Sequence, residues 1–522
     1  MKTALLERTI ETVVLAAAAW PVIQSGVSMS FWRAFPHFAR RLAALVSAYL
    51  VLVVVTMLWG PSWLTRTMAI AGGLGLLASF WHGRIARGRS KGWPPGALRI
   101  LPHDAWFDRS FFFEQSRRLG SPFKTSHFFR PMVCFVGFSD GWNFLKEHDS
   151  ELASPSLPFG RFIPNGFIRH MTPDRHAATK QLFRKVLARE VYEPLEPFVR
   201  ETIRRELNRI VVLGESRPSG VAPRSHLQRI VFAIWTRLFF NISNEAGLAS
   251  LKQLYKVADI RNPMRASAGS IDSALDEIER IVKQQLHDDE ASRAAAPRSF
   301  FEALATADGD AIDDPTVVRN LIYLLHTSWA DVSGLLVWLW RMMTEHAQWA
   351  ERVRKGDHQR GMAEGVQSLP TRIVMETLRL EQSEQLYRVT TRQIEHGNLV
   401  IPEGWLVRLC VREGHQDPSV FEHPEVFDPD RFLHHTFTRR EYSVFGGTLR
   451  HACLGEGLTT MVGRIFVEEL CGTVSWETTA DGEYEYGPWR HWRPSSAWRV
   501  RLAALEPVVG YTMLPSRHCT HT

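Results

Sequence analysis

The hydrophobic pattern separates an apolar N-terminal block from a longer amphipathic remainder. Residues 42–59 form an uncharged apolar run of eighteen residues, which just reaches the length needed to cross the hydrocarbon core of a membrane. A second run, 67–81, is shorter and rich in glycine. The better run starts too far from Met1 to be a cleavable signal peptide. We therefore predict a retained membrane anchor in residues 1–91, with 42–59 as the best span and 67–81 as a candidate second span.

Beyond the anchor, residues 92–522 are predicted to form one domain that is mainly α with a minor β subdomain. The linking stretch Gly92–Gly96 holds two prolines and cannot continue a helix. Residues 317–343 are hydrophobic nearly all round, which is typical of a helix buried through the centre of a domain. Further helices are expected over 174–213, 230–240, 271–287, 375–380 and 456–470, and strands over 126–129, 132–138, 386–392 and 406–411.

Charge and cysteine content exclude several classes of function. The formal net charge is +7, from 62 basic and 55 acidic residues spread along the chain, so nothing indicates binding to nucleic acid. Five cysteines without a pattern argue against a disulfide framework and for a reducing compartment. Basic residues flank the apolar block, and the cluster from Arg84 to Lys91 predicts that the following domain faces the cytosol.

Cys453 is the strongest candidate for chemistry. It lies in the glycine-rich segment 445–456, directly before a predicted helix whose unpaired N–H groups and dipole would favour a thiolate. Arg450 and His451 would add positive charge or hydrogen-bond donors for an acidic ligand group. A sulfur aimed in this way suits the axial position of a heme iron, and a buried structural cysteine would give the same local pattern.

Two further motifs precede the cysteine. Residues 375–379 contain an E-x-x-R element, and residues 427–432 contain a P-x-R-F element. With three motifs in this order and at these spacings, the chain resembles the cytochrome P450 family of heme-thiolate monooxygenases, from about Lys91 to the C-terminus. The resemblance implies a cytochrome P450 fold, preceded here by the transmembrane segments. It also implies heme b (iron protoporphyrin IX), with Cys453 as the thiolate ligand of the metal.

The resemblance implies that Glu376, Arg379 and Arg431 form an internal clamp that holds the cysteine loop against the core. Glu376 and Arg379 are three residues apart, so they share one helix face and can pair. The alternative is a surface ion pair worth about a few tenths of a kcal/mol. Apolar neighbours on both sides of the motif favour the buried clamp.

Four residues match family positions that bind the two heme propionates: His176, Lys180, Arg388 and His451. Lys180 stands where the family usually has arginine, and a lysine can neutralise a propionate without binding it through two hydrogen bonds. The resemblance also places Phe445 over the sulfur. Phe445 lies eight residues before the cysteine instead of the usual seven, so the loop carries an apparent one-residue insertion.

The long helix departs from the acid–alcohol pair with which the family delivers protons. Asp331 stands either at the alcohol position, with Ala330 at the acid position, or at the acid position, with Ser333 as a nearby hydroxyl. We predict Asp331 and Ser333 as catalytic residues in a proton relay, and the alternative for Asp331 is pairing with a local basic group. Leu325, Thr327 and Trp329 are predicted to face the substrate pocket.

The predicted function is a monooxygenase that inserts one oxygen atom from O2 into an apolar small molecule. A terpenoid, steroid or polyketide-like substrate in secondary metabolism is expected from the class of enzyme. The expected partners are NADPH-cytochrome P450 reductase and membrane lipid, and the expected location is the endoplasmic reticulum membrane with the catalytic domain in the cytosol. One rival is a heme-thiolate isomerase or dehydratase that needs no reductase. A second is a heme-binding scaffold without oxygen activation.

Overall fold

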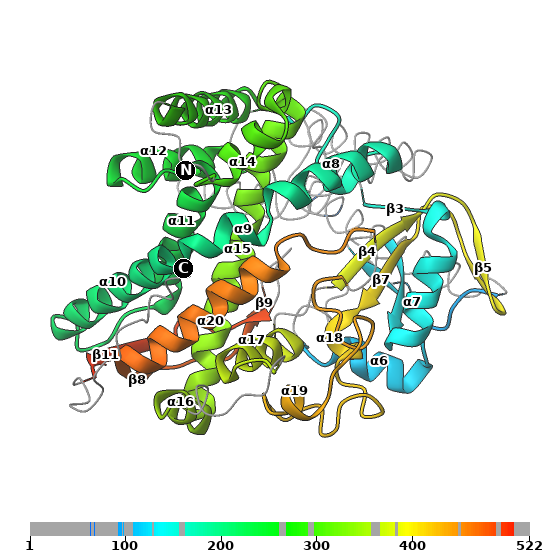
Figure 1. Ribbon diagram of the computed structural model, residues 1–522. Coiled ribbons are helices and arrows are strands. Elements are labelled where there is room, and N and C mark those ends of the chain that lie inside the picture. Colours follow the sequence, from blue (N-terminus) through cyan, green and yellow to red (C-terminus); the bar gives the residue numbers. More distant parts are fainter. Residues whose placement is uncertain are drawn as a thin grey trace, which may run out of the picture.

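Helices make up most of the structure, and small sheets lie beside them (Figure 1). The prediction of a mainly α protein with a minor β part is confirmed. The structure is a computed structural model, and it describes residues 63, 67, 92–96, 98, 108–127, 130–155, 162–259, 268–290, 297–356, 366–381, 385–446, 450–486 and 492–505.

Helix α15, Pro315–Glu345, passes through the middle of the helical part (Figure 1). Its first turn holds Pro315, and the Asp314 side chain caps it by accepting a hydrogen bond from the Thr316 N–H at 2.7 Å. Helices α11 (Pro223–Phe240), α17 (Leu369–Leu380) and α20 (Glu456–Thr473) pack against it. The predicted central helix is confirmed and is longer by two residues at each end.

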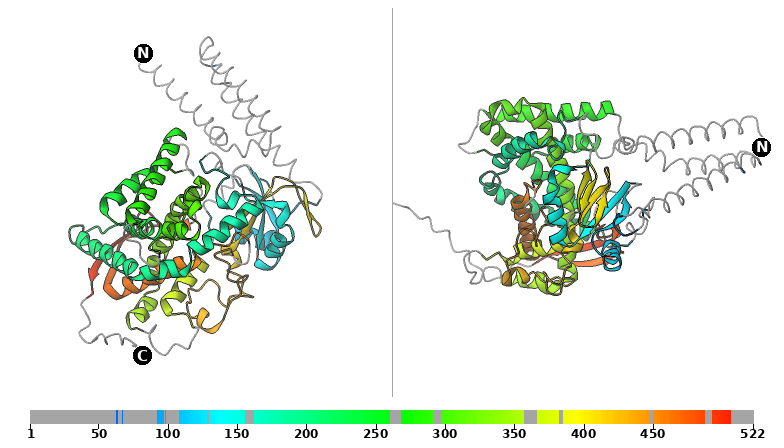
Figure 2. Two further views of the ribbon diagram at one scale, coloured as in Figure 1. Left: turned by 45° about the horizontal axis from the view of Figure 1, so that its top comes forward. Right: turned by 90° about the vertical axis from the view of Figure 1, so that its right-hand side faces the viewer.

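The other helices surround this centre, with α12 and α13 at the end of the molecule opposite α16 and α19 (Figures 1 and 2). The predicted helix 174–213 is in fact three α-helices and a short 3₁₀ segment, 193–195, and prolines 194 and 197 lie in the first turns of that segment and of α10. The bounds are α6 Phe111–Leu119, α7 Phe138–Glu147, α8 Pro173–Val186, α9 Arg189–Tyr192, α10 Glu196–Glu215, α12 Glu245–Val257, α13 Ala268–Glu290, α14 Phe300–Ala307, α16 Ala347–Arg354, α18 Val411–Gly414 and α19 Arg431–His434.

The largest sheet has five strands in the order β1-β2-β7-β4-β3. Strands β2 (Arg130–Val136) and β7 (Leu406–Cys410) run parallel, and the other pairs are antiparallel. All five residues of β7 are buried, because this strand lies in the middle of the sheet. The remaining strands are β1 Phe123–His127, β3 Leu152–Ala153, β4 Gln385–Thr390, β5 Ile394–His396, β6 Leu399–Ile401, β8 Val474–Ala480, β9 Glu485–Tyr486, β10 Trp492–Arg493 and β11 Arg499–Ala504.

The predicted membrane spans fall outside the described residues, apart from Thr67 at the start of the second. Among the residues that the structure describes, no helix combines the length and apolar character that a bilayer crossing requires.

Candidate functional site

The loop that carries Cys453 is closed by its own backbone. The Cys453 N–H donates to the Phe445 carbonyl at 2.8 Å, and the Gly455 N–H donates to the Cys453 Sγ at 3.3 Å. Gly446 has φ of +85° and its Cα lies so close to Ala452 that a Cβ would come within 3.3 Å of the Ala452 Cα, so glycine is required there. Phe445 packs against the main hydrophobic core despite the extra loop residue. The loop thus presents the sulfur with one N–H already aimed at it.

The Cys453 side chain reaches a cavity of about 690 Å³ that Lys180, Thr371 and Gly457 also line. Burial raises the pKa of the Cys453 thiol, the Gly455 N–H lowers it, and the Asp331 and Glu456 carboxylates raise it further. Helix α20 begins three residues after the cysteine, and the N–H that reaches the sulfur is that of Gly455. Because Gly455 is the N-cap residue of α20, this N–H is one of the helix N-terminal donors that were expected to favour a thiolate.

Buried basic groups without an acidic partner gather beside the loop. The rings of His176 and His451 lie 4.3 Å apart between centroids, and the Nδ1 atom of each is buried without a hydrogen-bond partner. The pKa of His451 is lowered to about 2, mainly by burial and secondly by the charge of Arg388. The pKa of His176 is lowered to about 4, mainly by burial and secondly by the charge of Lys180. Two imidazole nitrogens without partners, either of which can donate in the suitable tautomer, lie beside buried cations and leave a place for an anionic group.

Arg388 completes this basic group from strand β4. Arg388 is 8% exposed. Burial, followed by the charge of Arg169, lowers the pKa of its guanidinium to about 10. The carboxylate that acts on Arg388 most strongly is Asp149, which is already 3.2 Å from the Arg450 guanidinium. A buried arginine normally has a carboxylate of its own. His176, His451 and Arg388 therefore fit the two carboxylates of a heme, as the resemblance implied.

Lys180 has a different role from the one expected. Its ammonium donates to the carbonyls of Arg450 and Ala452, the latter at 3.0 Å, and the residue is 7% exposed. Burial and then Arg184 lower the pKa of Lys180, whereas Cys453 raises it. In this arrangement Lys180 connects helix α8 to the two residues on either side of His451, and two of its three N–H donors are directed to backbone carbonyls.

Glu376, Arg379 and Arg431 meet in the interior. Arg379 donates twice to the Glu376 carboxylate, from Nε and Nη2 at 2.8 Å each, and Arg431 Nε donates to the same carboxylate at 3.0 Å. The side chains of Glu376 and Arg379 are 0% exposed. The structure thus has the buried three-residue arrangement instead of a surface ion pair, and the arginines also donate to the carbonyls of the segment 415–426.

Sequence reasoning missed His415, which connects this group to the cysteine loop. Its ring is fully buried, its Nε2 accepts a hydrogen bond from the Ser443 N–H at 3.2 Å, and its carbonyl accepts from Arg379 at 2.7 Å. Burial and then the charge of Arg379 lower the pKa of His415, so the ring stays neutral and can accept. No motif marks this histidine in the sequence, because its partners are brought to it only by folding.

The middle of α15 has one open face. Ala330 and Asp331 are exposed although most of the helix is buried. Thr327 is half-buried and lies on the same face, because it precedes Ala330 by three residues and Asp331 by four. Asp331 is close enough to Cys453 to act on the pKa of its thiol.

Three predicted residues of this helix lie elsewhere. Ser333 is 2% exposed, and its hydroxyl donates to the Trp329 carbonyl at 2.6 Å. Because Ser333 lies two residues after Asp331 in the helix, the two side chains point to opposite sides. Trp329 donates its indole N–H to the Gln228 carbonyl of α11 at 2.8 Å. Leu325 is fully buried on the same side as Trp329. The pairing of Asp331 with Ser333 and the pocket positions of Leu325 and Trp329 are therefore not supported.

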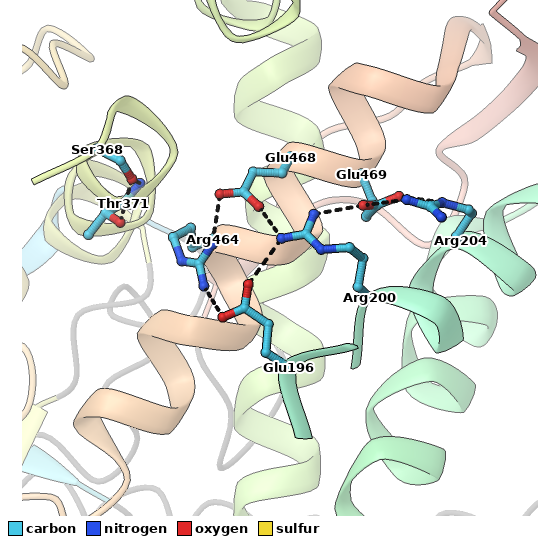
Figure 3. Close-up of polar contacts among 8 residues, drawn as sticks. All are labelled: Glu196, Arg200, Arg204, Ser368, Thr371, Arg464, Glu468 and Glu469. Carbon is cyan, nitrogen blue, oxygen red and sulfur yellow. Dashed lines mark hydrogen bonds and ion pairs between the residues drawn. The ribbon is translucent and has the colours of Figure 1, made fainter. Parts of the chain in front are cut away.

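Alternating charges hold α20 against α10 next to the site (Figure 3). Arg200 pairs with Glu468 at 2.6 Å and with Glu469 at 2.7 Å, and Arg204 also pairs with Glu469, whose side chain is 4% exposed. Arg464 on α20 pairs with Glu196 on α10 at 2.6 Å. Figure 3 also shows Ser368 and Thr371 in contact at the start of α17. Since α20 follows directly after Cys453, these ion pairs help to fix the loop.

Comparisons with known proteins agree with this geometry. A family model described as Cytochrome P450 matches residues 110–485. Abscisic acid 8'-hydroxylase 3 of Oryza sativa subsp. indica is 23% identical over 449 residues, covering 80% of this chain and 87% of that protein. Cytochrome P450 26B1 of Danio rerio is 25% identical over 405 residues, covering 70% and 77%.

Solved structures show the same fold. Cyanobacterial CYP120A1 with bound retinoic acid superimposes with a TM-score of 0.64 at 20% identity, covering 80% of this chain and 100% of that chain. A zebrafish cytochrome P450 with progesterone gives a TM-score of 0.61 at 18% identity, covering 78% and 100%.

Proposed function

The chain belongs to the cytochrome P450 family of monooxygenases, and we propose that it inserts one oxygen atom from O2 into a terpenoid or similarly apolar small molecule. The observation that carries the proposal is Cys453 with its Gly455 N–H, next to the unpartnered nitrogens of His176 and His451. We choose the terpenoid class because the rice relative is a hydroxylase of abscisic acid, which is a terpenoid acid. Steroids and polyketide-like compounds in secondary metabolism are the further candidates.

The proposed partners follow from the same class of enzyme. Two electrons from NADPH would arrive through NADPH-cytochrome P450 reductase. The apolar runs 42–59 and 67–81 and the basic cluster after them support an anchor in the endoplasmic reticulum membrane, with the domain in the cytosol. Membrane lipid would then also be the medium from which an apolar substrate enters.

Heme, when bound, supplies a thiolate-ligated iron that activates dioxygen. Cys453 would hold the metal, while His176, His451 and Arg388 would hold the carboxylates that heme carries. Lys180 keeps the carbonyls of Arg450 and Ala452 in place, so it orients the loop on both sides of His451. Asp331 is the one acid on the open face of α15 among the described residues, and its carboxylate would take a proton from water and release it into the pocket.

Asp331→Asn is expected to lower product formation about 10²- to 10⁴-fold, because a positioned proton donor contributes about this much. Heme content should not change. The measurement is product formed per NADPH consumed in a reconstituted system with reductase. Ser333→Ala serves as the matched control, since its hydroxyl is bonded to the helix backbone and its loss should change turnover little. Equal losses in both variants would contradict a relay role for Asp331.

Arg388→Leu is expected to speed heme release about 10- to 100-fold, because a hydrogen bond to a charged group contributes about 1.5–3 kcal/mol. The rate of heme transfer to an apoprotein acceptor in excess measures this directly. Arg392→Leu is the control, as Arg392 lies just beyond the end of the same strand with its side chain 70% exposed and paired with Glu151. If both variants release heme at the rate of the unaltered protein, Arg388 does not hold a propionate.

The first test of the whole proposal is the difference spectrum of the reduced, carbon-monoxide-treated protein, followed by a substrate screen with reductase. We expect a thiolate-type Soret band, and product from at least one terpenoid, with abscisic acid included in the panel. Steroids and polyketides form the comparison sets. Absence of the band in protein that contains heme would overturn the assignment of Cys453.

The altered α15 favours one alternative function. Because Ser333 is turned away from Asp331, the adjacent acid–alcohol pair that the family usually carries is missing from this helix. An enzyme that isomerises or dehydrates a peroxide needs no such delivery of protons to dioxygen. Turnover of a hydroperoxide without reductase or NADPH would favour this alternative, and strict dependence on both would favour the monooxygenase.

A further inference from the structure

A cluster of histidines and carboxylates lies away from Cys453, where the end of α7 meets the β5–β6 hairpin. Glu147, His148 and His396 each place one potential ligand atom within 4.8 Å of the other two. Ligand atoms around a tetrahedral zinc ion lie about 3.3 Å apart. Side-chain rotations that move these ligand atoms closer together by about 1.5 Å would therefore bring the three residues into coordination distance of one ion. Glu147 is exposed and can make such a rotation, whereas the two imidazoles are partly buried.

Each histidine in this cluster already has a carboxylate on one ring nitrogen. The Nδ1 atom of His148 bonds to Glu151, and the Nε2 atom of His396 bonds to Asp140 at 3.0 Å. Because a carboxylate only accepts, each bonded nitrogen carries the proton, and the other nitrogen of the neutral ring keeps its lone pair. Metal-binding histidines in proteins are oriented in this way by a carboxylate behind them.

The charge and the scaffold also suit a divalent cation. Three carboxylates (Glu147, Glu151 and Asp140) surround two imidazoles, and the one paired arginine is Arg392. His148 is the C-cap residue that follows α7, where the helix dipole favours positive charge.

The ligands stand on packed elements. The ring of Phe144 from α7 contacts both histidine rings, with centroids 4.9 Å from His148 and 5.1 Å from His396. Ile394 and Ile401 bury the base of the hairpin in the same hydrophobic cluster as Phe144. The two imidazoles are therefore held near each other before any ion arrives, which lowers the entropy lost on binding.

We propose that Glu147, His148 and His396 form a binding site for a divalent transition-metal ion of the zinc type, with water as the fourth ligand. Two imidazoles, one carboxylate and an open position are a ligand set typical of zinc. The ion would join the end of α7 to the β5–β6 hairpin. Asp149, which follows His148, pairs with Arg450 of the cysteine loop. A metal ion bound at His148 would therefore also stabilise the segment that contacts this loop.

The test is zinc binding to the tag-free, heme-loaded full chain, measured by equilibrium dialysis with metal analysis and by thermal unfolding. We expect one equivalent of zinc to remain bound after dialysis and the melting temperature to rise. The carbon-monoxide difference band should not change. His148→Gln and His396→Gln should each remove that equivalent and the rise in melting temperature. Asp140→Asn and Glu151→Gln should weaken binding about 10- to 100-fold, as carboxylates behind a ligating histidine do.

His423→Gln is the control, because its side chain is 75% exposed and offers an ordinary surface imidazole. It should bind zinc like the unaltered protein. If one histidine variant does not fold, shown by its heme spectrum, the other carries the test. X-ray absorption at the zinc edge should show nitrogen and oxygen neighbours without sulfur. Binding that survives both histidine substitutions, or a sulfur neighbour, would show that the ion sits elsewhere and overturn the proposal.

Discussion

Replacing Cys453 by alanine is expected to abolish turnover and the thiolate-type Soret band of the reduced, carbon-monoxide-treated protein. The resemblance to the family assigns the sulfur as the ligand of the metal, and the Gly455 N–H donates to it at 3.3 Å. Serine at this position keeps the size of the side chain but offers a hydroxyl that stays protonated near neutral pH. Cys453→Ser should therefore also lose the band and the activity, even where some heme is retained.

Cys471→Ala is the matched control for this experiment. Cys471 is a fully buried free cysteine on α20, and burial raises the pKa of its thiol to about 12, so it is expected to be inert. The control should keep the band and the activity, with at most a loss of stability from the small cavity. If Cys453→Ala keeps the thiolate-type band, another residue ligates the metal and the site described here is wrong.

Glu376→Gln is expected to destabilise the protein by about 3–5 kcal/mol, because it leaves Arg379 and Arg431 buried without a counter-charge. The same change should lower the fraction of protein that retains heme, since Arg379 also binds the His415 carbonyl and His415 accepts from Ser443 next to the cysteine loop. The urea dependence of the free energy of unfolding and the ratio of heme to protein absorbance measure the two effects.

The chain offers a matched control for the buried pair. Glu351 and Arg354 form an ion pair with the same spacing and order, at 2.7 Å, with side chains 46% and 32% exposed. Glu351→Gln should leave stability and heme retention almost unchanged, because water solvates both partners. A loss of stability in Glu376→Gln no larger than that of Glu351→Gln would mean that the three-residue arrangement does not hold the loop.

The site residues that sequence reasoning found share one property. Cys453, Glu376 and Arg379 stand in motifs whose partners lie within a few residues, so local spacing reports on their geometry. The residues that sequence reasoning located least well are those whose surroundings depend on how α15 is rotated about its axis. A helix that is apolar nearly all round carries no pattern that distinguishes its exposed face, so the sequence did not show that Ser333 and Leu325 are buried and that Trp329 bonds to α11.

The amino-acid sequence alone determined the mainly helical class, the central helix, four of the five strands of the main sheet and the identity of the candidate metal ligand. These depend on periodicity and on short motifs, which are local properties of the chain. Only the tertiary structure decided that Lys180 binds the loop backbone, that His176 and His451 lie ring to ring, and that His415 joins the buried arginines to the loop. These contacts join residues far apart in the chain, and which of them form depends on how whole elements pack against one another.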